Sequence, residues 1–413
     1  MLPIVVIGAG PAGLLAAGRA AECGAPVRLL EKNHQPGRKL LITGAGRCNI
    51  TSAVDQDTFI GQFFGQGRFL YPALQTMYRE ELLDLLAKSG VRCQVDHQGK
   101  YFPVTNQAGD VLSALLRYGQ KQGTHLVTDS EVQSVEKKQD HFEVTTSQGT
   151  VLAGAVILTT GGMTYPVTGS TGDGYRLATH LGHTIVPPRP ALAPLITEQS
   201  YIRELAGLSL PDVEVRLVQP GQKPITRRGD LLLTHKGVSG PVILRLSREL
   251  KGTASLHINL QPSMTRPELA SAILEQLAQG GRQHIKNCLD DFLPHRLVAP
   301  LLAAAGIEAD RMAAQAGRRN AEQIAQAISD WTLTVTGTQG VHIAMVTAGG
   351  VALREINPAT LESKLVPGFY FAGEILDLDG DTGGFNLQAA CSTGYLAGQS
   401  AAAALLGHPG NDR

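Results

Sequence analysis

The sequence predicts an α/β fold in which the two ends of the chain build one parallel sheet and the middle is an insertion. Residues 3–7 (PIVVI) and 26–30 (PVRLL) are short apolar runs typical of buried parallel strands, with a glycine turn and an Ala/Leu helix between them. Such a β-α-β unit is right-handed and lies in a parallel sheet. Strand-like sequence returns at 341–351 and 366–373, ahead of an Ala-rich helix at about 387–406. The two ends therefore predict one domain.

The middle of the chain has a different character. The stretch PPRPALAPL, which begins at Pro187, is proline-rich and cannot continue a helix. Residues 211–260 then alternate apolar and polar side chains, which predicts a small antiparallel sheet or barrel, and 265–330 has helical spacing. The predicted domains are a sheet domain of residues 1–190 with 336–413, an inserted β-barrel domain of residues 191–262 and an inserted helical domain of residues 263–335.

The charge balance argues against a polyanionic partner. The 413 residues include 36 Lys and Arg and 36 Asp and Glu, so the formal net charge is zero. A chain without a basic excess has no electrostatic reason to bind nucleic acid, and no basic tail suggests an anionic membrane surface. We therefore predict a small-molecule partner, no nucleic acid and no membrane, while the sequence specifies no oligomeric state.

Cysteine usage and hydropathy favour a cytoplasmic protein. Five cysteines are scattered without a CxxC pair, which predicts neither a metal site nor a disulfide framework. No apolar run reaches the ~18 residues that span a bilayer. The N-terminal apolar stretch runs directly into Gly8, and cleavage there would remove a strand that the fold needs.

The turn after the first strand fits the dinucleotide pattern G-x-G-x-x-G. Gly8 allows the sharp turn out of the strand, Gly10 lets backbone N–H groups approach a pyrophosphate, and Gly13 lets the helix pack on the sheet. Glu31 ends the second strand, where it is expected to accept hydrogen bonds from ribose hydroxyls and to repel a 2′-phosphate. The turn alone does not distinguish NAD from FAD. The residues predicted to hold the pyrophosphate are Gly8, Gly10, Pro11, Ala12 and Gly13.

A second segment favours FAD. Residues 37–51 (GRKLLITGAGRCNIT) begin six residues after Glu31, so they emerge at the carboxyl edge of the same sheet, where ligands bind. Their basic side chains can neutralise phosphate and their small residues suit a ligand cradle, and a basic surface loop is the alternative. The residues of this segment assigned to the cofactor are Arg38, Lys39, Gly44, Gly46, Arg47, Cys48, Asn49 and Thr51.

The third segment is FYFAGEILDLDGDTGGFNLQAACSTGYLAG, residues 369–398. A strand is followed by Glu374, which is expected to hold a ribityl hydroxyl, and by a helix whose N-terminus can stabilise a reduced, anionic flavin. A calcium loop is the alternative for LDLDGDTGG, but Gln388 stands where the twelfth position of such a loop needs a glutamate. The residues assigned to the cofactor are Gly373, Glu374, Asp381, Gly383, Gly384, Asn386, Leu387 and Gln388.

Two weaker elements agree with a flavin. The small-residue turn at 159–162 ends a strand and can pass close to the cofactor, and the strand that carries Val132 can reach the adenine with its backbone. A protein that binds NAD alone would need neither. Only one G-x-G-x-x-G has a predicted strand before it, a predicted helix after it and an acidic residue at the expected distance. A nicotinamide cofactor would therefore bind transiently, without a Rossmann domain of its own. The residues added to the predicted FAD site are Val132, Thr160, Gly161 and Gly162.

Together these segments resemble a bacterial family, often labelled NAD(P)/FAD-dependent oxidoreductases, that includes aminoacetone oxidase and a bile-acid Δ4,6-reductase-like branch. The matching stretches are VVIGAGPAGLLAA (5–17), GRKLLITGAGRCNIT (37–51), GGMTYPVTGSTGDGYRLATHLGH (161–183), LLLTHKGVSGPVILRLS (231–247) and the stretch from VTAGG to YLAG (346–398). The resemblance implies a Rossmann-like FAD-binding domain of the two-dinucleotide-binding flavoprotein type, with an inserted small β-barrel and a helical domain.

The resemblance also carries residue-level implications. It places FAD at most of the motif residues named above and adds Lys32 to them. Ala45 and Thr43 stand where the family often carries glycine and serine, and both are small enough for binding to survive. The segment before Val346 is more divergent, which leaves that wall of the active site unassigned.

No side chain is compelled to act as an acid or base, because the flavin itself carries the hydride chemistry. Three weak candidates remain: Cys48 as a redox thiol, His235 facing the substrate, and Tyr165 as a hydrogen-bond donor to a substrate carbonyl. Packing, a turn histidine and a cover for the cofactor are the respective alternatives. Cys391 also lies in a cofactor motif, and Asp173 is expected to cap a helix.

The predicted function is that of an FAD-dependent oxidoreductase that transfers hydride between the flavin and a small organic substrate, bound between the sheet domain and the insertion. A reductase of an activated C=C bond, with NAD(P)H as a transient electron donor, and an amine or alcohol oxidase that uses O₂ are equal alternatives. A non-catalytic or RNA-modifying flavoprotein is disfavoured by the zero net charge. A menaquinone-linked dehydrogenase is disfavoured because no amphipathic membrane helix is evident.

Overall fold

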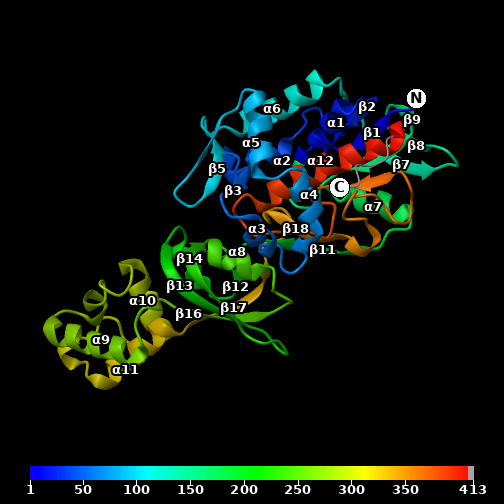
Figure 1. The fold of residues 1–413 in the computed structure, drawn as a ribbon. Helices are drawn as coiled ribbons and strands as arrows, with labels where there is room; N and C mark the ends of the chain where they lie inside the picture. The colour runs from blue at the N-terminus through cyan, green and yellow to red at the C-terminus, as the bar shows by residue number, and fades with distance from the viewer. Residues whose placement is uncertain (408–413) are drawn as a thin grey trace. The chain divides into compact units, whose positions relative to one another are not determined.

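The computed structural model describes residues 1–407, and the chain forms two compact units (Figure 1). The first, here the sheet unit, comprises residues 1–191 and the segment from 344 onward, and the second, here the barrel unit, comprises residues 192–343. Both end segments of the chain thus belong to one unit. Within residues 1–407 no helix is both long enough and apolar enough to cross a bilayer.

A five-stranded parallel sheet forms the centre of the sheet unit. Its order is β19-β10-β1-β2-β6, and each neighbouring pair is parallel. All residues of β1 and β10 are buried, as expected for strands that are covered on both faces. Because β19 comes from the C-terminal segment, both ends of the chain build one sheet, which confirms the predicted fold class. The strands are β1 (Ile4–Ile7), β2 (Val27–Leu30), β6 (His125–Val127), β10 (Ala155–Leu158) and β19 (Phe369–Phe371).

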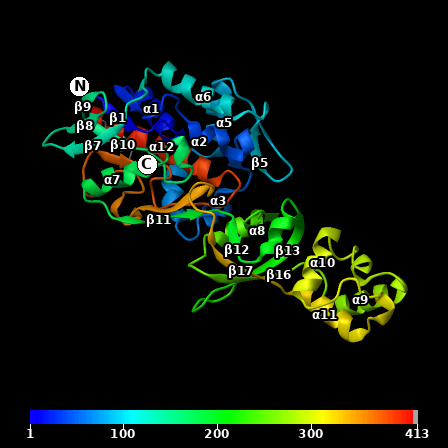
Figure 2. The same ribbon diagram turned by 180° about the vertical axis from the view of Figure 1, so that it is seen from behind.

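Two helices from opposite ends of the chain pack directly against each other. The helices α1 (Pro11–Glu22) and α12 (Phe385–Leu406) lie side by side in both views (Figures 1 and 2). A Cβ atom added to Gly394 or Gly398 of α12 would lie 2.2 Å from a carbonyl oxygen of α1. Glycine at both positions therefore allows the two backbones to approach closely, and a larger side chain there would separate the helices.

Smaller elements surround this sheet. The other α-helices of the unit are α2 (Arg38–Ile42), α3 (Gln56–Gly61), α4 (Tyr71–Thr76), α5 (Arg79–Lys88), α6 (Ala108–Lys121) and α7 (Asp173–His180). Three small antiparallel sheets consist of β3 (Thr51–Ser52), β5 (Lys100–Pro103) and β4 (Cys93–Val95), of β7 (Val132–Lys137), β8 (Phe142–Thr146) and β9 (Gly149–Ala153), and of β11 (Ile185–Ala191) with β18 (Val346–Val351). The chain leaves the sheet unit after β11 and returns at β18.

The barrel unit contains a closed six-stranded barrel and a group of helices. The strand order is β12-β15-β14-β13-β16-β17, and the helical segment lies in the chain between β16 and β17. The barrel strands are β12 (Leu195–Thr197), β13 (Ser209–Val218), β14 (Ile225–Thr234), β15 (Gly237–Ser239), β16 (Ala254–Asn259) and β17 (Trp331–Thr338). The helices are α8 (Pro241–Ser247), α9 (Arg266–Gly280), α10 (His295–Ala304) and α11 (Arg318–Ser329).

The last barrel strand falls in a range that the sequence assigned to the helical domain. Residues 331–335 belong to β17, which pairs with β16 and β12. The pattern WTLTVT places Trp331, Leu333 and Val335 in the interior and the threonines between them outward, which is the period of a strand. The helical segment therefore ends at Ser329.

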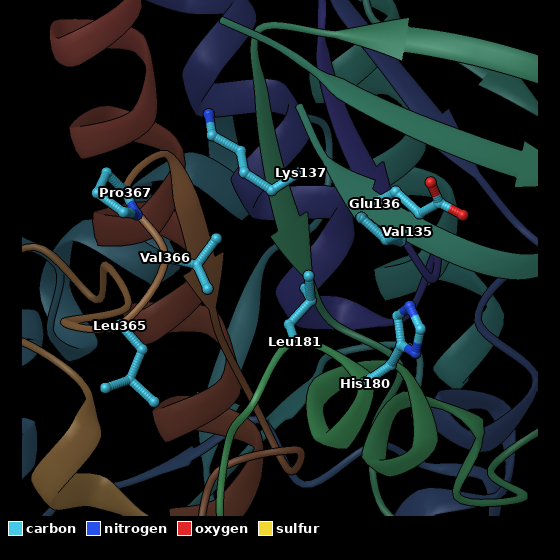
Figure 3. Close-up of a pocket in the computed structure, with 8 residues that line it drawn as sticks. All are labelled: Val135, Glu136, Lys137, His180, Leu181, Leu365, Val366 and Pro367. Atoms are coloured by element: carbon cyan, nitrogen blue, oxygen red, sulfur yellow. The ribbon is translucent and has the colours of Figure 1, made fainter. Parts of the chain in front are cut away.

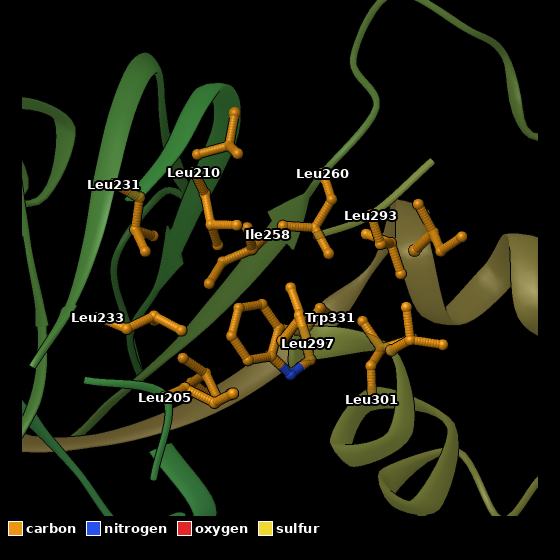
Figure 4. Close-up of a cluster of buried hydrophobic side chains, with 14 of the residues drawn as sticks. Leu205, Leu210, Leu231, Leu233, Ile258, Leu260, Leu293, Leu297, Leu301 and Trp331 are labelled. Atoms are coloured by element: carbon orange, nitrogen blue, oxygen red, sulfur yellow. The ribbon is translucent and has the colours of Figure 1, made fainter. Parts of the chain in front are cut away.

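The barrel and the helices share one hydrophobic core (Figure 4). Trp331 of β17 lies among leucines of the barrel and of α10, including Leu297 and Leu301, and its indole N–H donates to the hydroxyl of Tyr201 at 3.0 Å. One continuous core thus runs from the barrel into the helical segment, in which α9 packs on α11 and α11 also contacts β16 and β17.

Candidate functional site

In the glycine turn between β1 and α1, Gly8 and Gly13 leave no room for a side chain, whereas Gly10 faces open space. A Cβ atom on Gly13 would lie 1.8 Å from the carbonyl oxygen of Gly8, and one on Gly8, whose φ is +102°, would lie 2.8 Å from the oxygen of Thr159. A Cβ atom on Gly10 would meet no protein atom within 4 Å. Gly10 is the N-cap of α1, and Pro11 is its first residue. The open side at the start of the helix is where the predicted pyrophosphate would lie.

Glu31 fixes this turn from the end of β2. The residue is buried, and one carboxylate oxygen accepts from the backbone N–H of Ala9 at 2.9 Å. The other oxygen accepts from the backbone N–H of Asn33 at 2.9 Å and from its side-chain amide at 2.6 Å. The acidic group that the sequence assigned to the ribose therefore lies between the glycine turn and the segment after β2.

Lys32 holds the start of α7 in place. Its ammonium group donates to the hydroxyl of Thr171 at 2.6 Å and forms an ion pair with Asp173. Burial alone would raise the pKa of Asp173, but hydrogen bonds from Lys32 and Thr171 outweigh it and lower that pKa. The predicted capping role of Asp173 is wrong, because the N-cap of α7 is Gly172 and Asp173 is the first helical residue.

The loop of residues 43–48 contains consecutive left-handed backbone conformations. Gly44 has φ +56°, Ala45 +57° and Gly46 +85°, and Cys48 has φ +63°. Left-handed conformations suit glycine but strain other residues. The guanidinium of Arg47 lies 4.5 Å from the ring centre of Phe102, while that of Arg38 donates to Asn33.

Asn49 and Thr51, just after this loop, meet the N-terminus of α12, so the second and third predicted cofactor segments are in contact. The side chain of Asn49 accepts from the backbone N–H of Gly384 at 3.1 Å and donates to the carbonyl of Thr51 at 3.2 Å, with its amide oriented to satisfy both. Gly384 has φ +92°, and a Cβ atom there would lie 2.7 Å from the backbone of Thr51. Residues more than 330 positions apart in the chain are thus in backbone contact.

A half-buried polar network connects four further segments. The ammonium of Lys39 donates to Glu374 at 2.7 Å and to the hydroxyl of Thr164 at 2.8 Å, and Thr164 donates to the other oxygen of Glu374 at 3.3 Å. The same oxygen of Glu374 accepts from the backbone N–H of Thr347 at 2.8 Å. The hydroxyl of Thr347 in turn accepts from the backbone N–H of Met163. Glu374 is thus oriented by a lysine, a hydroxyl and a backbone amide.

Sequence reasoning missed Thr347. The residue is fully buried in β18, and a Cβ atom on Gly162 would lie 2.2 Å from its hydroxyl oxygen. It fixes the turn of residues 161–163 and the carboxylate of Glu374 at once. A usable signal was the small-residue run VTAGG that begins at Val346, in which threonine is the one polar side chain.

The acidic loop before α12 is closed by its own side chains. The amide of Asn386 accepts from the backbone N–H of Gly380 and donates to its carbonyl, each at 2.7 Å, and also donates to the carbonyl of Asp381. Asp381 is buried and accepts from the N–H of Thr382 at 2.6 Å. Among residues 1–407 no group of three or more His, Cys, Asp or Glu side chains is arranged to hold a metal ion.

Three buried polar atoms of the predicted cofactor residues lack a hydrogen-bond partner within residues 1–407. They are the hydroxyl oxygens of Thr51 and Thr160 and the amide oxygen of Gln388. An unpaired buried polar atom costs about 1–3 kcal/mol, so such an atom calls for a water or a ligand as its partner. Six other buried polar atoms within residues 1–407, outside the predicted cofactor residues, are also unpaired. The first three atoms belong to three of the chain segments predicted to meet in the FAD site, namely 37–51, 159–162 and 369–398, and with the open space beside Gly10 they fit a polar cofactor.

The other assigned residues lie in these same segments. Gly161 has φ +72° and Gly383 has φ +127°, and a Cβ atom on Gly373 would lie 2.9 Å from that of Ala12. Leu387 packs on the core beneath the first turn of α12. Val132 is buried at the start of β7, outside the network just described, and its predicted contact with the adenine stays a prediction.

The three catalytic candidates differ in their surroundings. Cys48 is fully buried, and burial raises the pKa of its thiol to about 12, which favours packing over redox reactivity. His235 is exposed in the turn between β14 and β15 of the barrel unit. Tyr165 is half-buried in the sheet unit, one residue after Thr164 of the polar network.

A surface pocket elsewhere in the sheet unit is separate from this site (Figure 3). It lies between β7, the end of α7 and the loop before β19. None of its lining residues was assigned to the cofactor. They are Val135, Glu136, Lys137, His180, Leu181, Leu365, Val366 and Pro367.

Comparison with known proteins identifies the family of the chain. A family model described as HI0933-like protein Rossmann domain matches residues 2–400. The chain is 31% identical over 404 residues to the ribosomal RNA dihydrouridine synthase of Escherichia coli (strain K12), covering 97% of this chain and 98% of that protein. It is also 31% identical over 408 residues to the 3-dehydro-bile acid delta(4,6)-reductase of Clostridium scindens, with 97% and 98% covered.

A solved structure shares the fold. The 3-ketosteroid-delta4-(5alpha)-dehydrogenase from Rhodococcus jostii RHA1, in complex with 4-androstene-3,17-dione, superposes with a TM-score of 0.54 at 16% sequence identity. The match covers 97% of this chain and 96% of that one. At this identity the likeness concerns the fold alone.

Proposed function

The chain belongs to the HI0933-like family of Rossmann-fold flavoproteins, whose members are flavin-dependent oxidoreductases, and from this premise we propose that it is an FAD-dependent reductase of C=C bonds conjugated to a carbonyl group, with NAD(P)H as hydride donor. The observation that carries the proposal is the agreement between two equally similar relatives. Each aligns with nearly the whole chain, and their names give different substrates but one kind of bond change.

The two named reactions share their chemistry. A delta(4,6)-reductase of a 3-dehydro bile acid acts on double bonds conjugated to the 3-ketone. A dihydrouridine differs from uridine by two hydrogens across the ring double bond next to a carbonyl. In both, a hydride adds to the carbon remote from the carbonyl and a proton adds to the adjacent carbon. A flavin is suited to this step because it can receive a hydride from a nicotinamide and pass it on.

The residues of the site can be assigned to parts of FAD. We assign the pyrophosphate to the open side of the turn at Gly10 and the ribose to Glu31, which is already held in place by two backbone amides. Lys39 and Glu374 hold each other and are assigned to the ribityl chain and the adjoining phosphate. The N-terminus of α12 at Gly384 favours negative charge on a reduced flavin ring.

A two-stage experiment tests the proposal. The purified protein, loaded with FAD, is first mixed with NADH or NADPH without oxygen, and bleaching of the flavin absorbance is followed. The reduced protein is then mixed with 4-androstene-3,17-dione, cyclohex-2-enone or uridine, and return of the absorbance is compared with that in buffer. We expect bleaching by one nucleotide and reoxidation by at least one conjugated acceptor. No bleaching by either nucleotide would overturn the proposed donor.

The same experiment separates the reductase from an oxidase. A flavin oxidase would not be bleached by NAD(P)H, and its reduced form would be reoxidised much faster by dissolved O₂ than by any conjugated alkene. If the three acceptors fail and air restores the absorbance within the mixing time, an amine or alcohol oxidase becomes the better assignment.

A second candidate function is the reduction of uridine in ribosomal RNA. It is favoured by two relatives named ribosomal RNA dihydrouridine synthase, from Escherichia coli and Haemophilus influenzae, each 31% identical along nearly the whole chain. The zero net charge of the chain disfavours strong binding to a polyanion. Incubating the reduced protein with ribosomal RNA and measuring the gain of two hydrogens per uridine by mass spectrometry decides between this substrate and a small molecule.

A further inference from the structure

Tyr165 has a backbone conformation that two steric effects disfavour. Its φ is +54° and its ψ +58°, in the left-handed region that bulky residues rarely adopt. It also precedes Pro166, and the residue before a proline is normally pushed into an extended conformation. A strained backbone conformation persists only where contacts with the rest of the fold hold it, and such residues cluster at functional sites.

The strained backbone is held by its own turn. The carbonyl of Tyr165 accepts two hydrogen bonds from Thr168, one from the backbone N–H at 2.8 Å and one from the hydroxyl at 2.7 Å. Gly169 then donates from its N–H to the carbonyl of Pro166 at 3.0 Å. These three hydrogen bonds hold the backbone of Tyr165 in its left-handed conformation.

Both sides of this turn are anchored to the predicted cofactor segments. On one side, Thr164 bonds to Lys39 and Glu374. On the other, the amide of Asn33 lies 3.4 Å from the carbonyl of Thr168, and a Cβ atom on Gly169 would lie 2.4 Å from that amide. Tyr165 lies between the two anchors, so its position is fixed relative to the groups assigned to FAD.

The phenol is free to meet a ligand. Tyr165 is half-buried, and within residues 1–407 its hydroxyl is neither donor nor acceptor of a hydrogen bond to another residue. Other partly buried tyrosines do: the hydroxyl of Tyr78 donates to Val54 at 3.0 Å, and that of Tyr118 donates to Glu22 at 2.8 Å. A strained backbone that presents an uncommitted phenol beside a cofactor frame is the arrangement expected of a substrate-binding group.

We propose that Tyr165 contacts the substrate of the reaction proposed above, on which this inference rests. Its hydroxyl donates a hydrogen bond to the carbonyl oxygen of the conjugated alkene. Bound FAD, once reduced, would supply a hydride to the remote carbon, the electron pair of the double bond would move toward that oxygen, and the hydrogen bond from Tyr165 would stabilise the resulting enolate. Water then supplies the proton to the carbon next to the carbonyl. One hydride and one proton are added, and NAD(P)H restores the hydride.

The test compares Tyr165→Phe and Tyr165→Gly with the control Tyr118→Phe. The control removes a hydroxyl in α6, which donates to Glu22 and takes no part in this turn. Each FAD-loaded variant is reduced with dithionite and mixed with whichever of 4-androstene-3,17-dione, cyclohex-2-enone or uridine reoxidises the wild type fastest. We expect Tyr165→Phe to slow this reoxidation about 10²-fold, as the loss of a donor to a developing oxyanion does. Reduction by NAD(P)H and reoxidation by O₂ stay unchanged, as do all rates of Tyr118→Phe.

The glycine variant tests whether the strain serves function rather than folding. Tyr165→Gly removes both the phenol and the steric conflict, so its reoxidation by the alkene falls as far while its Tm equals or exceeds that of the wild type. A Tm lower by more than about 5 °C, or a Tyr165→Phe rate within twofold of the wild type, would overturn the inference. A wild type that no acceptor reoxidises would instead overturn the proposed reductase function, and this inference with it.

Discussion

The glycine turn after β1 and the loop of residues 43–48 both belong to the predicted cofactor site, but their constrained positions carry different residues. In the turn, glycine stands where a Cβ atom would collide with backbone atoms, as at Gly13. In the loop, Ala45 and Cys48 occupy left-handed conformations themselves. A collision with backbone cannot be relieved by any side chain, whereas a left-handed residue costs only about 1–2 kcal/mol. A sequence motif is therefore strict in the first region and permissive in the second.

The largest effect is expected from Gly13→Ala. Its Cβ atom would lie 1.8 Å from the carbonyl oxygen of Gly8, so α1 must move away from the sheet. We expect a loss of about 3 kcal/mol or more in the free energy of unfolding, together with loss of FAD binding. Urea unfolding of the apoprotein and fluorescence titration with FAD measure the two effects.

Gly10→Ala is the matched variant in the same turn. Its Cβ atom meets no protein atom within 4 Å and its φ is −79°, so the stability of the apoprotein should change by less than about 0.5 kcal/mol. The affinity for FAD should fall at least tenfold, because the methyl group takes space assigned to the pyrophosphate. Unchanged FAD affinity in Gly10→Ala would show that the pyrophosphate does not lie there.

A smaller effect is expected where the loop meets the other end of the chain. Gly384→Ala combines a φ of +92° with a contact of 2.7 Å to the backbone of Thr51. Gly46→Ala is its control, since Gly46 has φ +85° but its added Cβ atom would approach other atoms only to 4.0 Å. We expect Gly384→Ala to lose about 2–4 kcal/mol and Gly46→Ala about 1–2 kcal/mol in thermal or urea unfolding. Equal losses in the two variants would mean that the backbone of Thr51 can move away from the added Cβ atom at little cost in free energy.

The contrast also explains what could be predicted from the sequence. The parallel sheet was predictable, because the turn from Gly8 to Gly13 and the strand sequences obey local rules that few alternatives satisfy. The assignment of three segments to a cofactor rests on the same rules and stays a prediction. That the two chain ends form one sheet followed from the same patterns, and β19 beside β10 confirms it.

The polar network around Glu374 could not be predicted from local sequence patterns. Thr347 bonds to Met163, 184 positions away, and to Glu374. A single threonine in a small-residue run has no periodicity that would reveal such partners. The same holds for buried His183, whose ring lies 2.9 Å from the hydroxyl of Ser363 across 180 positions. Side-chain hydrogen bonds between distant segments depend on the completed fold, so sequence patterns are silent about them.

The reactivity of Cys48 provides a chemical test of the loop of residues 43–48. Because its thiol is buried and its pKa is raised to about 12, only about one thiol in 10⁴ is ionised at pH 8, and the thiolate is the reactive form. We expect iodoacetamide at pH 8 to modify the partly exposed Cys23 of the native protein and to leave Cys48 unmodified until the protein unfolds. Peptide mass spectrometry after timed labelling measures this, and rapid native labelling of Cys48 would restore it as a redox candidate.

The smallest effect is expected from Ala45→Gly, which makes the loop resemble the turn. Ala45 has φ +57° and ψ +41°, so glycine removes a left-handed penalty of about 1–2 kcal/mol but adds about 0.5–1 kcal/mol of chain entropy to be lost on folding. The free energy of unfolding should rise by about 0.5–1 kcal/mol. Ala404→Gly in the exposed part of α12 is the control and should lower it by about 1 kcal/mol. If both variants are destabilised alike, the left-handed conformation of Ala45 carries no strain. The presence of residues other than glycine at left-handed positions of the loop then has another cause.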